Sequence, residues 1–302
     1  MKTYDILNIL KEAGPQSGWQ LLEKTGMEAL PLWQTCRQAP EVRFERVGRR
    51  FLRLDKNVEG YARLSPSIRR EFLTYTTLGL SHQSAEIEAK AQQLRQEIRK
   101  ISQAKLELAR EAMATTVQTL AGWESMQEQV CFIIAGDITY EMAHAVPRPE
   151  ISTGKMVRGS DLDIIVIAED EVPKADLNQL DNAILRKKHF LLVHPNYQEE
   201  IDYLVKDIAK VRQQLAFDSF QHMIASKIIN EGVLLYGNET VFRKVKAMVA
   251  EYGVAEKLAL LEKRALETRE EAEISLLNSN TSQADPACVD LFYTREEGDE
   301  IY

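Results

Sequence analysis

Two uninterrupted apolar runs place the strongest constraint on how this chain folds. Residues 130–135 read Val-Cys-Phe-Ile-Ile-Ala and end at Gly136, and residues 164–167 read Ile-Ile-Val-Ile. Runs of this length without polar alternation are typical of strands that are buried on both faces. Helical segments lie on either side of these runs in the sequence, so the chain is predicted to have an α+β fold.

The composition is that of a water-soluble globular protein. Of 302 residues, 44% are hydrophobic and 28% are charged, and the mean hydropathy is -0.31. No run approaches the roughly 20 apolar residues of a membrane helix, and the N-terminus lacks the pattern of a signal peptide. The cysteines Cys36, Cys131 and Cys288 form no CxxC pair and are odd in number. We therefore expect no membrane association, no disulfide framework and a cytoplasmic location.

A pair of aspartates opens the second apolar strand, in the sequence Gly159-Ser160-Asp161-Leu162-Asp163. Because side chains alternate along a strand, Asp161 and Asp163 should point to the same face. Two carboxylates held together in this way repel each other unless a cation neutralises them. Oxygen ligands favour Mg²⁺ or Mn²⁺ over zinc, so the pair predicts a site for one of these cations.

A third carboxylate is expected on an adjacent strand if two metal ions are to be held. After a helix over residues 174–186 and a strand over 190–193, residues 200–205 read Glu-Ile-Asp-Tyr-Leu-Val. Asp202 lies between apolar residues in this predicted strand and is the first candidate. Glu200 is two residues away, on the same face, and is the second candidate.

These residues resemble the DNA polymerase β-like nucleotidyltransferase superfamily, in its minimal nucleotidyltransferase form. The resemblance covers about residues 120–240, and residues 227–237 resemble the segment that closes this domain. It implies a mixed sheet flanked by helices and an enzyme that transfers an NMP from an NTP such as ATP to a hydroxyl group. It also implies metal ligands at Asp161, Asp163 and Asp202, of which Asp202 is also catalytic because it helps deprotonate the acceptor. Nucleotide contacts are implied at Gly136, Asp137, Gly159 and Ser160.

The sequence departs from the family pattern in two places. Gly136-Asp137 stands where the family has Gly-Gly or Gly-Ser, and an aspartate cannot donate a hydrogen bond to a phosphate. The stretch between Gly136 and Asp161 is longer than usual and would form a lid whose Arg148, Lys155 or Arg158 contacts the triphosphate. Lys227, on a predicted helix, could reach a phosphate but is interpreted as a solvated lysine. The acceptor (protein, RNA or small molecule) stays open.

The N-terminal 60 residues resemble a winged helix-turn-helix domain. Helices are predicted over residues 4–12, 19–24 and 28–38, followed by a hairpin of strands 42–47 and 50–54 around Gly48. In that family the third helix enters the DNA major groove and the hairpin touches the backbone. The net charge of -8 leaves nucleic-acid binding to a local basic patch. That patch consists of hairpin arginines, of which the candidates are Arg43, Arg46, Arg49 and Arg50. A protein-interaction or dimerisation module is the alternative.

The remaining segments are predicted to be largely helical. Residues 61–120 form a spacer, because residues 84–127 are rich in helix formers and carry apolar residues every seven positions, interrupted by Lys105. This seam would either form a homodimeric coiled coil or pack on its own chain. Residues 241–273 predict one or two helices and 278–283 a polar linker. The acidic tail, 288–302, is free, is docked through Leu291-Phe292-Tyr293, or occupies the basic hairpin.

Three functional hypotheses follow. The first is a Mg²⁺-dependent nucleotidyltransferase, spanning residues 121–240, with a winged-helix module for targeting. The second is a DNA-binding regulator in which a degenerate nucleotidyltransferase domain only senses nucleotide. The third is a scaffold that uses the long helix and predicts neither activity. The first two differ in whether the acidic triad supports transfer.

Overall fold

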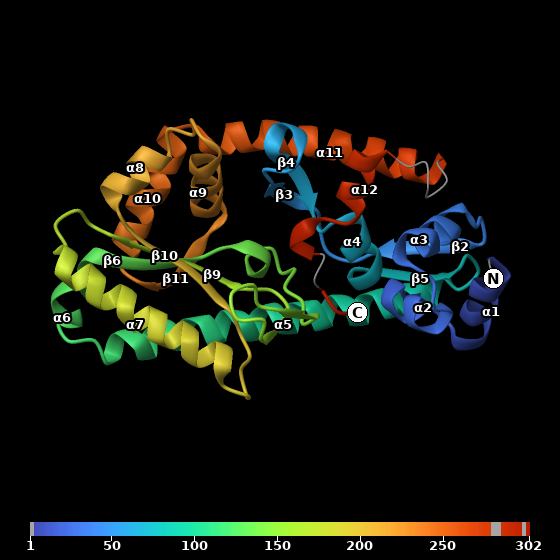
Figure 1. Cartoon of the computed structure of the whole chain (residues 1–302), viewed down its shortest axis with the longest axis horizontal. Coiled ribbons are helices and arrows are strands. Elements are labelled where there is room, and N and C mark those ends of the chain that lie inside the picture. Colours follow the sequence, from blue (N-terminus) through green and yellow to red (C-terminus); the bar gives the residue numbers. More distant parts are fainter. Residues whose placement is uncertain (1–2, 279–284, 298–299) are drawn as a thin grey trace. The chain divides into compact units, whose positions relative to one another are not determined.

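The computed structural model describes residues 3–278, 285–297 and 300–302. The chain is an α+β protein with a mixed sheet, and it divides into two compact units. The first unit contains residues 1–98, 260–300 and 302, and the second contains residues 99–259 and 301. Figure 1 labels the helices and strands of both units.

The first unit begins with three helices and a three-stranded antiparallel sheet. The helices are α1 (Thr3–Ala13), α2 (Gly18–Thr25) and α3 (Ala29–Gln38), and the strand order is β1 (Gln16–Ser17), β5 (Thr76–Leu80), β2 (Val42–Arg46). Ser17 begins α2 with a capping box that includes Gln20, and Gly26 ends it in the left-handed conformation. Leu21, Leu30 and Trp33 are buried in the core beneath the sheet.

The predicted hairpin around Gly48 is wrong, although both of its strands exist. β2 pairs with β5, whereas β3 (Phe51–Leu54) pairs with β4 (Ala62–Ser65). Three of the four residues of β3 are buried, so this strand requires a partner inside the unit. The short helices η1 (Glu59–Tyr61) and α4 (Ile68–Thr74) complete the segment between β2 and β5. Residues 61–83 therefore belong to the first unit and do not form a helical spacer.

The long helix α5 (Ser84–Gln118) is shorter than predicted. It ends before Gly122, which adopts the left-handed conformation. Its apolar seam is partly buried within the chain. Ile87 and Ala91 are inaccessible to solvent, and a Cβ at Gly79 of β5 would overlap the Ile87 side chain. Ala112 lies in the core of the second unit. Leu94, Ile101 and Leu108 are half-buried.

The C-terminal helices lie where the sequence predicts them, as α10 (Glu239–Glu251) and α11 (Val254–Asn278), and a short α12 (Pro286–Phe292) and η4 (Arg295–Glu297) follow. Docking of the tail is confirmed, because Phe292 is fully buried and packs edge-on against Trp33 at 5.7 Å between ring centroids.

The described acids Glu297 and Glu300 pair with Arg70 of α4, so the prediction that the tail occupies the basic hairpin is wrong. Most of the predicted linker, residues 279–283, lies outside the described residues.

The second unit is built on a four-stranded mixed sheet in the order β10, β9, β6, β11. The strands are β6 (Val130–Ile134), β9 (Leu162–Ala168), β10 (Ile201–Asp207) and β11 (Val233–Gly237); β9 and β10 are parallel, and the other pairs are antiparallel. The end of α5, with α6 (Trp123–Met126) and α7 (Lys174–Val193), covers one face. The opposite face carries α8 (Ile208–Gln214), α9 (Phe220–Glu231) and α10 (Figure 1).

The predicted strand over residues 190–193 is wrong, because α7 continues to Val193. Leu180, Ile184 and Leu191 are buried at spacings of four and seven residues, which places them on one face of a helix against the sheet. A four-residue apolar run carries no strand signal of its own, and helical spacing over the longer segment prevails. No helix among the described residues has the length and apolar character needed to cross a bilayer.

Lys206 of β10 is buried, and its ammonium donates to Gln214 at 2.9 Å. Burial, with a smaller effect of Lys210, lowers the pKa of Lys206 to about 8. Because its charge is disfavoured in the folded state, the residue costs stability below pH 8, and this cost disappears as the pH rises toward the ordinary lysine value. We expect Lys206→Met to raise the free energy of unfolding by on the order of 2 kcal/mol at pH 7, in urea titrations. An equal gain at pH 10.5 would contradict this reason.

Candidate active site

Four carboxylates lie at the start of the two parallel strands. Asp163 of β9 is directly opposite Asp202 of β10, and Leu162 is opposite Ile201. The hydrogen bonding extends to Glu200, the residue before Ile201: its carbonyl accepts a hydrogen bond from the Leu162 amide at 2.9 Å. Leu162 and Ile201 are buried in the core on the α7 side of the sheet. Strand alternation therefore directs Asp163 and Asp202 to the other face, together with Glu200 and Asp161 two residues before them.

The Asp163 carboxylate lies against the backbone of the loop that follows β6. Ala135 donates its amide to the Asp163 carbonyl at 3.0 Å, and the chain then turns into η3 (Gly136–Ile138). Gly136 has a φ of 70°, and a Cβ at this position would overlap Asp163 Oδ2. A glycine is thus required here both for the turn and for the close approach of the carboxylate.

This contact yields a prediction for Gly136→Ala. The added methyl group must displace the Asp163 carboxylate, and the positive φ adds backbone strain of about 1 kcal/mol. We expect the variant to fold but to bind Mn²⁺ at least about tenfold more weakly, as measured by electron paramagnetic resonance titration. Gly154→Ala is the matched control, because Gly154 also has a positive φ but has open space around it. Equal losses in both variants would assign the effect to backbone strain alone.

The other loop residues predicted to bind nucleotide lie close to Gly136. The Ser160 hydroxyl donates to Asp137 Oδ2 at 2.8 Å and accepts a hydrogen bond from the His144 amide at 3.2 Å. Gly159 is packed so closely that a Cβ there would overlap the His144 carbonyl. Asp137 therefore points toward Ser160, and its charge is held by a hydroxyl group of the same site.

Arg148 neutralises part of the acidic cluster. It lies on β7 (Pro147–Pro149), which pairs with β8 (Met156–Arg158) in the long insertion. Its guanidinium forms an ion pair with Asp161, donates to Glu200 at 2.8 Å and donates to the Gly159 carbonyl at 3.2 Å. Of the three cations that the sequence proposes for the triphosphate, Arg148 lies at the carboxylates, whereas Lys155 and Arg158 have exposed side chains.

The donor chemistry of this cluster fits a hard divalent cation. Asp161, Asp163 and Asp202 offer only carboxylate oxygens, which Mg²⁺ and Mn²⁺ prefer. In the described part of the chain no three His, Cys, Asp or Glu side chains meet closely enough to form a metal site. Asp161 is instead turned to Arg148, and Asp202 is exposed. The strands bring the three backbone positions together, and the side chains are held by internal partners.

Glu231 and Lys227 of α9 were not assigned to the site from the sequence. Glu231 accepts hydrogen bonds from the Gly136 amide at 3.4 Å and from the Tyr140 hydroxyl at 2.6 Å, and it pairs with Lys227. Lys227 is buried, so its interpretation as a solvated lysine is wrong. The spacing of four residues between the two is typical of an ion pair on a helix and would have indicated it.

Lys105, the residue that interrupts the apolar seam of α5, contacts the backbone and a side chain next to the carboxylate cluster. Its ammonium donates to the Arg158 carbonyl at 2.7 Å, directly before Gly159, and pairs with Glu199, directly before Glu200. Burial lowers the pKa of Lys105 and raises that of Glu199, and the charge of each partner opposes the shift. The charged interruption of the heptad pattern therefore has a structural role.

The arginines predicted to contact nucleic acid do not share one hairpin. Arg43 and Arg46 lie on β2 with exposed side chains, and Arg49 is exposed in the following loop. Arg50 instead donates to both oxygens of Glu71, at 2.6 and 2.7 Å, and to Glu273 at 2.7 Å. Its guanidinium is therefore committed to the interior of the first unit.

A scan against protein-family models finds no match to this chain, and a search of curated proteins gives no match either.

Proposed function

We propose that the second unit is a Mg²⁺-dependent nucleotidyltransferase that moves an NMP from an NTP to a hydroxyl acceptor. The observation that carries this proposal is the register of β9 and β10, which sets Asp163 beside Asp202 and places Asp161 on the same face. Carboxylates gathered at the ends of neighbouring strands, next to a glycine loop, are the arrangement that two-metal phosphoryl chemistry requires.

Each residue has a role that follows from its position. Asp161, Asp163 and Asp202 would hold Mg²⁺, which when bound offsets the negative charge of the triphosphate and of the reacting oxygens. Asp202 is the exposed member, on the edge strand of the sheet, where an acceptor can approach. Its carboxylate is suited to accept the proton of the acceptor hydroxyl. Gly136 and Gly159 hold the backbone of the two loops close to the carboxylates, and Arg148 supplies a cation that could pair with a phosphate oxygen.

The test is incubation of the purified protein with α-³²P-labelled NTPs, Mg²⁺ and three acceptor classes: the protein itself, RNA and small-molecule alcohols. Transfer of label to one acceptor, abolished by Asp202→Asn and by chelation, supports the proposal. Binding of nucleotide without transfer to any acceptor would overturn it and favour the second candidate.

The second candidate is a winged-helix regulator that senses nucleotide through a degenerate transferase domain. Two observations favour it: Asp137 holds the Ser160 hydroxyl that would face a phosphate, and Arg148 already neutralises Asp161. The helices α1 to α3 and the sheet β1-β5-β2 resemble a winged helix in which β3, β4 and α4 are inserted between the strands of the wing. Sequence-specific DNA binding that depends on Arg43 and Arg46 would support it.

A further inference from the structure

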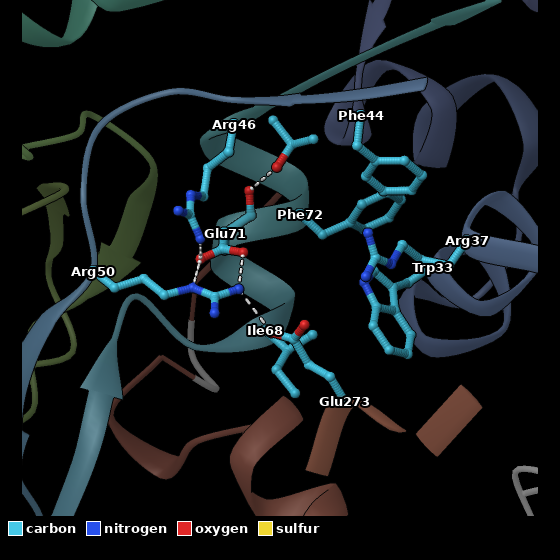
Figure 2. Close-up of a pocket in the computed structure, with 10 residues that line it drawn as sticks. Trp33, Arg37, Phe44, Arg46, Arg50, Ile68, Glu71, Phe72 and Glu273 are labelled. Atoms are coloured by element: carbon cyan, nitrogen blue, oxygen red, sulfur yellow. Dashed lines mark hydrogen bonds and ion pairs between the residues drawn. The ribbon is translucent and has the colours of Figure 1, made fainter. Parts of the chain in front are cut away.

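A cavity of about 260 Å³ opens in the first unit, and none of its lining residues belongs to the carboxylate site described above. α3, β2, α4 and α11 all contribute to its lining. Figure 2 shows Arg46 and Arg50 on one side of Glu71, and Arg37 together with the rings of Trp33, Phe44 and Phe72 on the other. The cavity thus has arginines on both sides and an aromatic wall on one.

The two acids of the lining are already neutralised. Arg50 donates to both oxygens of Glu71 and to Glu273, and Arg269 of α11 donates to Glu273 at 2.7 Å. Burial by itself would raise the pKa of Glu71, but Arg50, Arg269 and Arg46 together lower it below the ordinary value. Both carboxylates are bound to arginine, so neither is available to hold a cationic ligand.

Two arginines of the lining are bound less tightly than Arg50. Arg46 forms a long ion pair with Glu71, at 3.9 Å, and the Arg37 guanidinium lies over the Phe44 ring at 5.2 Å from its centroid. Within the described residues neither Arg37 nor Arg46 donates a hydrogen bond. The lining has three arginines against two glutamates, so its formal charge is +1. One negative charge on a ligand would balance it.

The other wall is apolar and flat. Trp33, Ile68 and Phe72 are almost completely buried, and Phe44 and Phe72 lie with ring centroids 6.3 Å apart. Aromatic walls of this kind favour a planar apolar body, which gains from ring contacts beyond the burial of its area. The volume is slightly below the range of drug-sized ligand pockets, so the ligand should be small.

We propose that this cavity binds a small planar organic monocarboxylate. Arg46 donates hydrogen bonds to the carboxylate, and the planar body packs against Trp33 and Phe72, where Arg37 adds a second positive charge. A guanidinium matches a carboxylate in geometry as well as in charge. Inorganic phosphate fits less well, because it is partly a dianion at neutral pH and has no apolar body for the aromatic wall.

The test is isothermal titration calorimetry of the full chain with four probes: benzoate, indole-3-acetate, benzamide and inorganic phosphate. We expect saturable binding of at least one of the two carboxylates, and binding of benzamide and phosphate at least about tenfold weaker. Arg46→Gln should weaken carboxylate binding at least about tenfold. Arg43→Gln is the matched control, because Arg43 lies on the same strand with the same exposed side-chain fraction, 49%, but not in the lining.

Four results would overturn the proposal. They are the absence of saturable binding of both carboxylates to the folded protein, benzamide binding as tightly as benzoate, phosphate binding more tightly than either carboxylate, and an equal loss of binding in Arg43→Gln. Circular dichroism of each variant establishes that the fold is intact. Because no residue of the acidic cluster is altered, these outcomes leave the proposed transferase activity to its own test.

Discussion

Replacing Asp163 by asparagine should lower the rate of nucleotidyl transfer by about 10³-fold or more, while the protein stays folded. Asp163 is the central member of the acidic cluster: it lies opposite Asp202, two residues from Asp161, and against the backbone of Gly136. The amide keeps the shape of the side chain but removes the charge that a divalent cation requires. Loss of one hydrogen-bond donor to the charge that develops in a transition state typically costs 10²–10³-fold in rate, and loss of a proposed metal ligand should cost at least as much.

The measurement is the initial rate of label transfer at saturating Mg²⁺ and NTP. Glu171→Gln is the control, because Glu171 is an exposed acid that follows the far end of β9 and should leave the rate within about twofold. Thermal unfolding of Asp163→Asn should occur at or above the wild-type temperature, since mutual repulsion among the carboxylates is reduced. A variant that keeps more than a tenth of the wild-type rate would contradict the role assigned to Asp163.

Glu71→Ala should destabilise the first unit by about 3–5 kcal/mol, because it leaves buried guanidinium groups without their counter-charge. Glu71 binds Arg50 through both oxygens and lies 3.6 Å from Arg269, whose side chain is only 3% exposed. Burial lowers the pKa of Arg269, whereas the charges of Glu71 and Glu273 raise it; the net direction is down. Removal of Glu71 therefore makes the charge of Arg269 still more costly.

Urea unfolding at pH 7 measures this loss, with the exposed Glu88→Gln on α5 as the control. The effect has a defined pH dependence. The pKa of Glu71 is lowered in the folded state, so its contribution is complete above the ordinary value of 4.5 and is lost as the pH falls through the folded value. The difference in the free energy of unfolding between wild type and Glu71→Ala should become smaller in that acidic range.

A double-mutant cycle that combines Glu71→Ala with Arg50→Met should give a coupling energy above about 1 kcal/mol. A coupling energy near zero would contradict the proposed ion-pair network.

The sequence was most informative where a strand is fully buried. The apolar runs that became β6 and β9 contain no competing helical spacing, so their type and position were predicted correctly. Asp202 was placed in a strand because its neighbours are apolar, and β10 lies there although it is only partly buried. Its register with β9 could only be inferred from the family resemblance, because the partner of a strand depends on contacts that are distant in the sequence.

The wrong predictions also have physical causes. Both strands of the predicted hairpin exist, but β2 pairs with β5, which comes later in the chain, and not with β3. Residues 190–193 are too short an apolar run to distinguish strand from helix, and the buried face of α7 decides the outcome. Arg148, Lys105 and Glu231 each also bind a partner more than 50 residues away, namely Glu200, Arg158 and Gly136, and a single sequence carries no signal for such long-range contacts.

The most direct test of the central claim is a crystal structure of the full chain with Mn²⁺ and a non-hydrolysable NTP, in which anomalous scattering locates the metal. The account predicts Mn²⁺ bound by Asp161, Asp163 and Asp202 next to the triphosphate, with Arg148 released from Asp161 and turned toward a phosphate oxygen. A triphosphate bound elsewhere, or Arg148 still paired with Asp161 while no anomalous signal lies near Asp163 and Asp202, would contradict it.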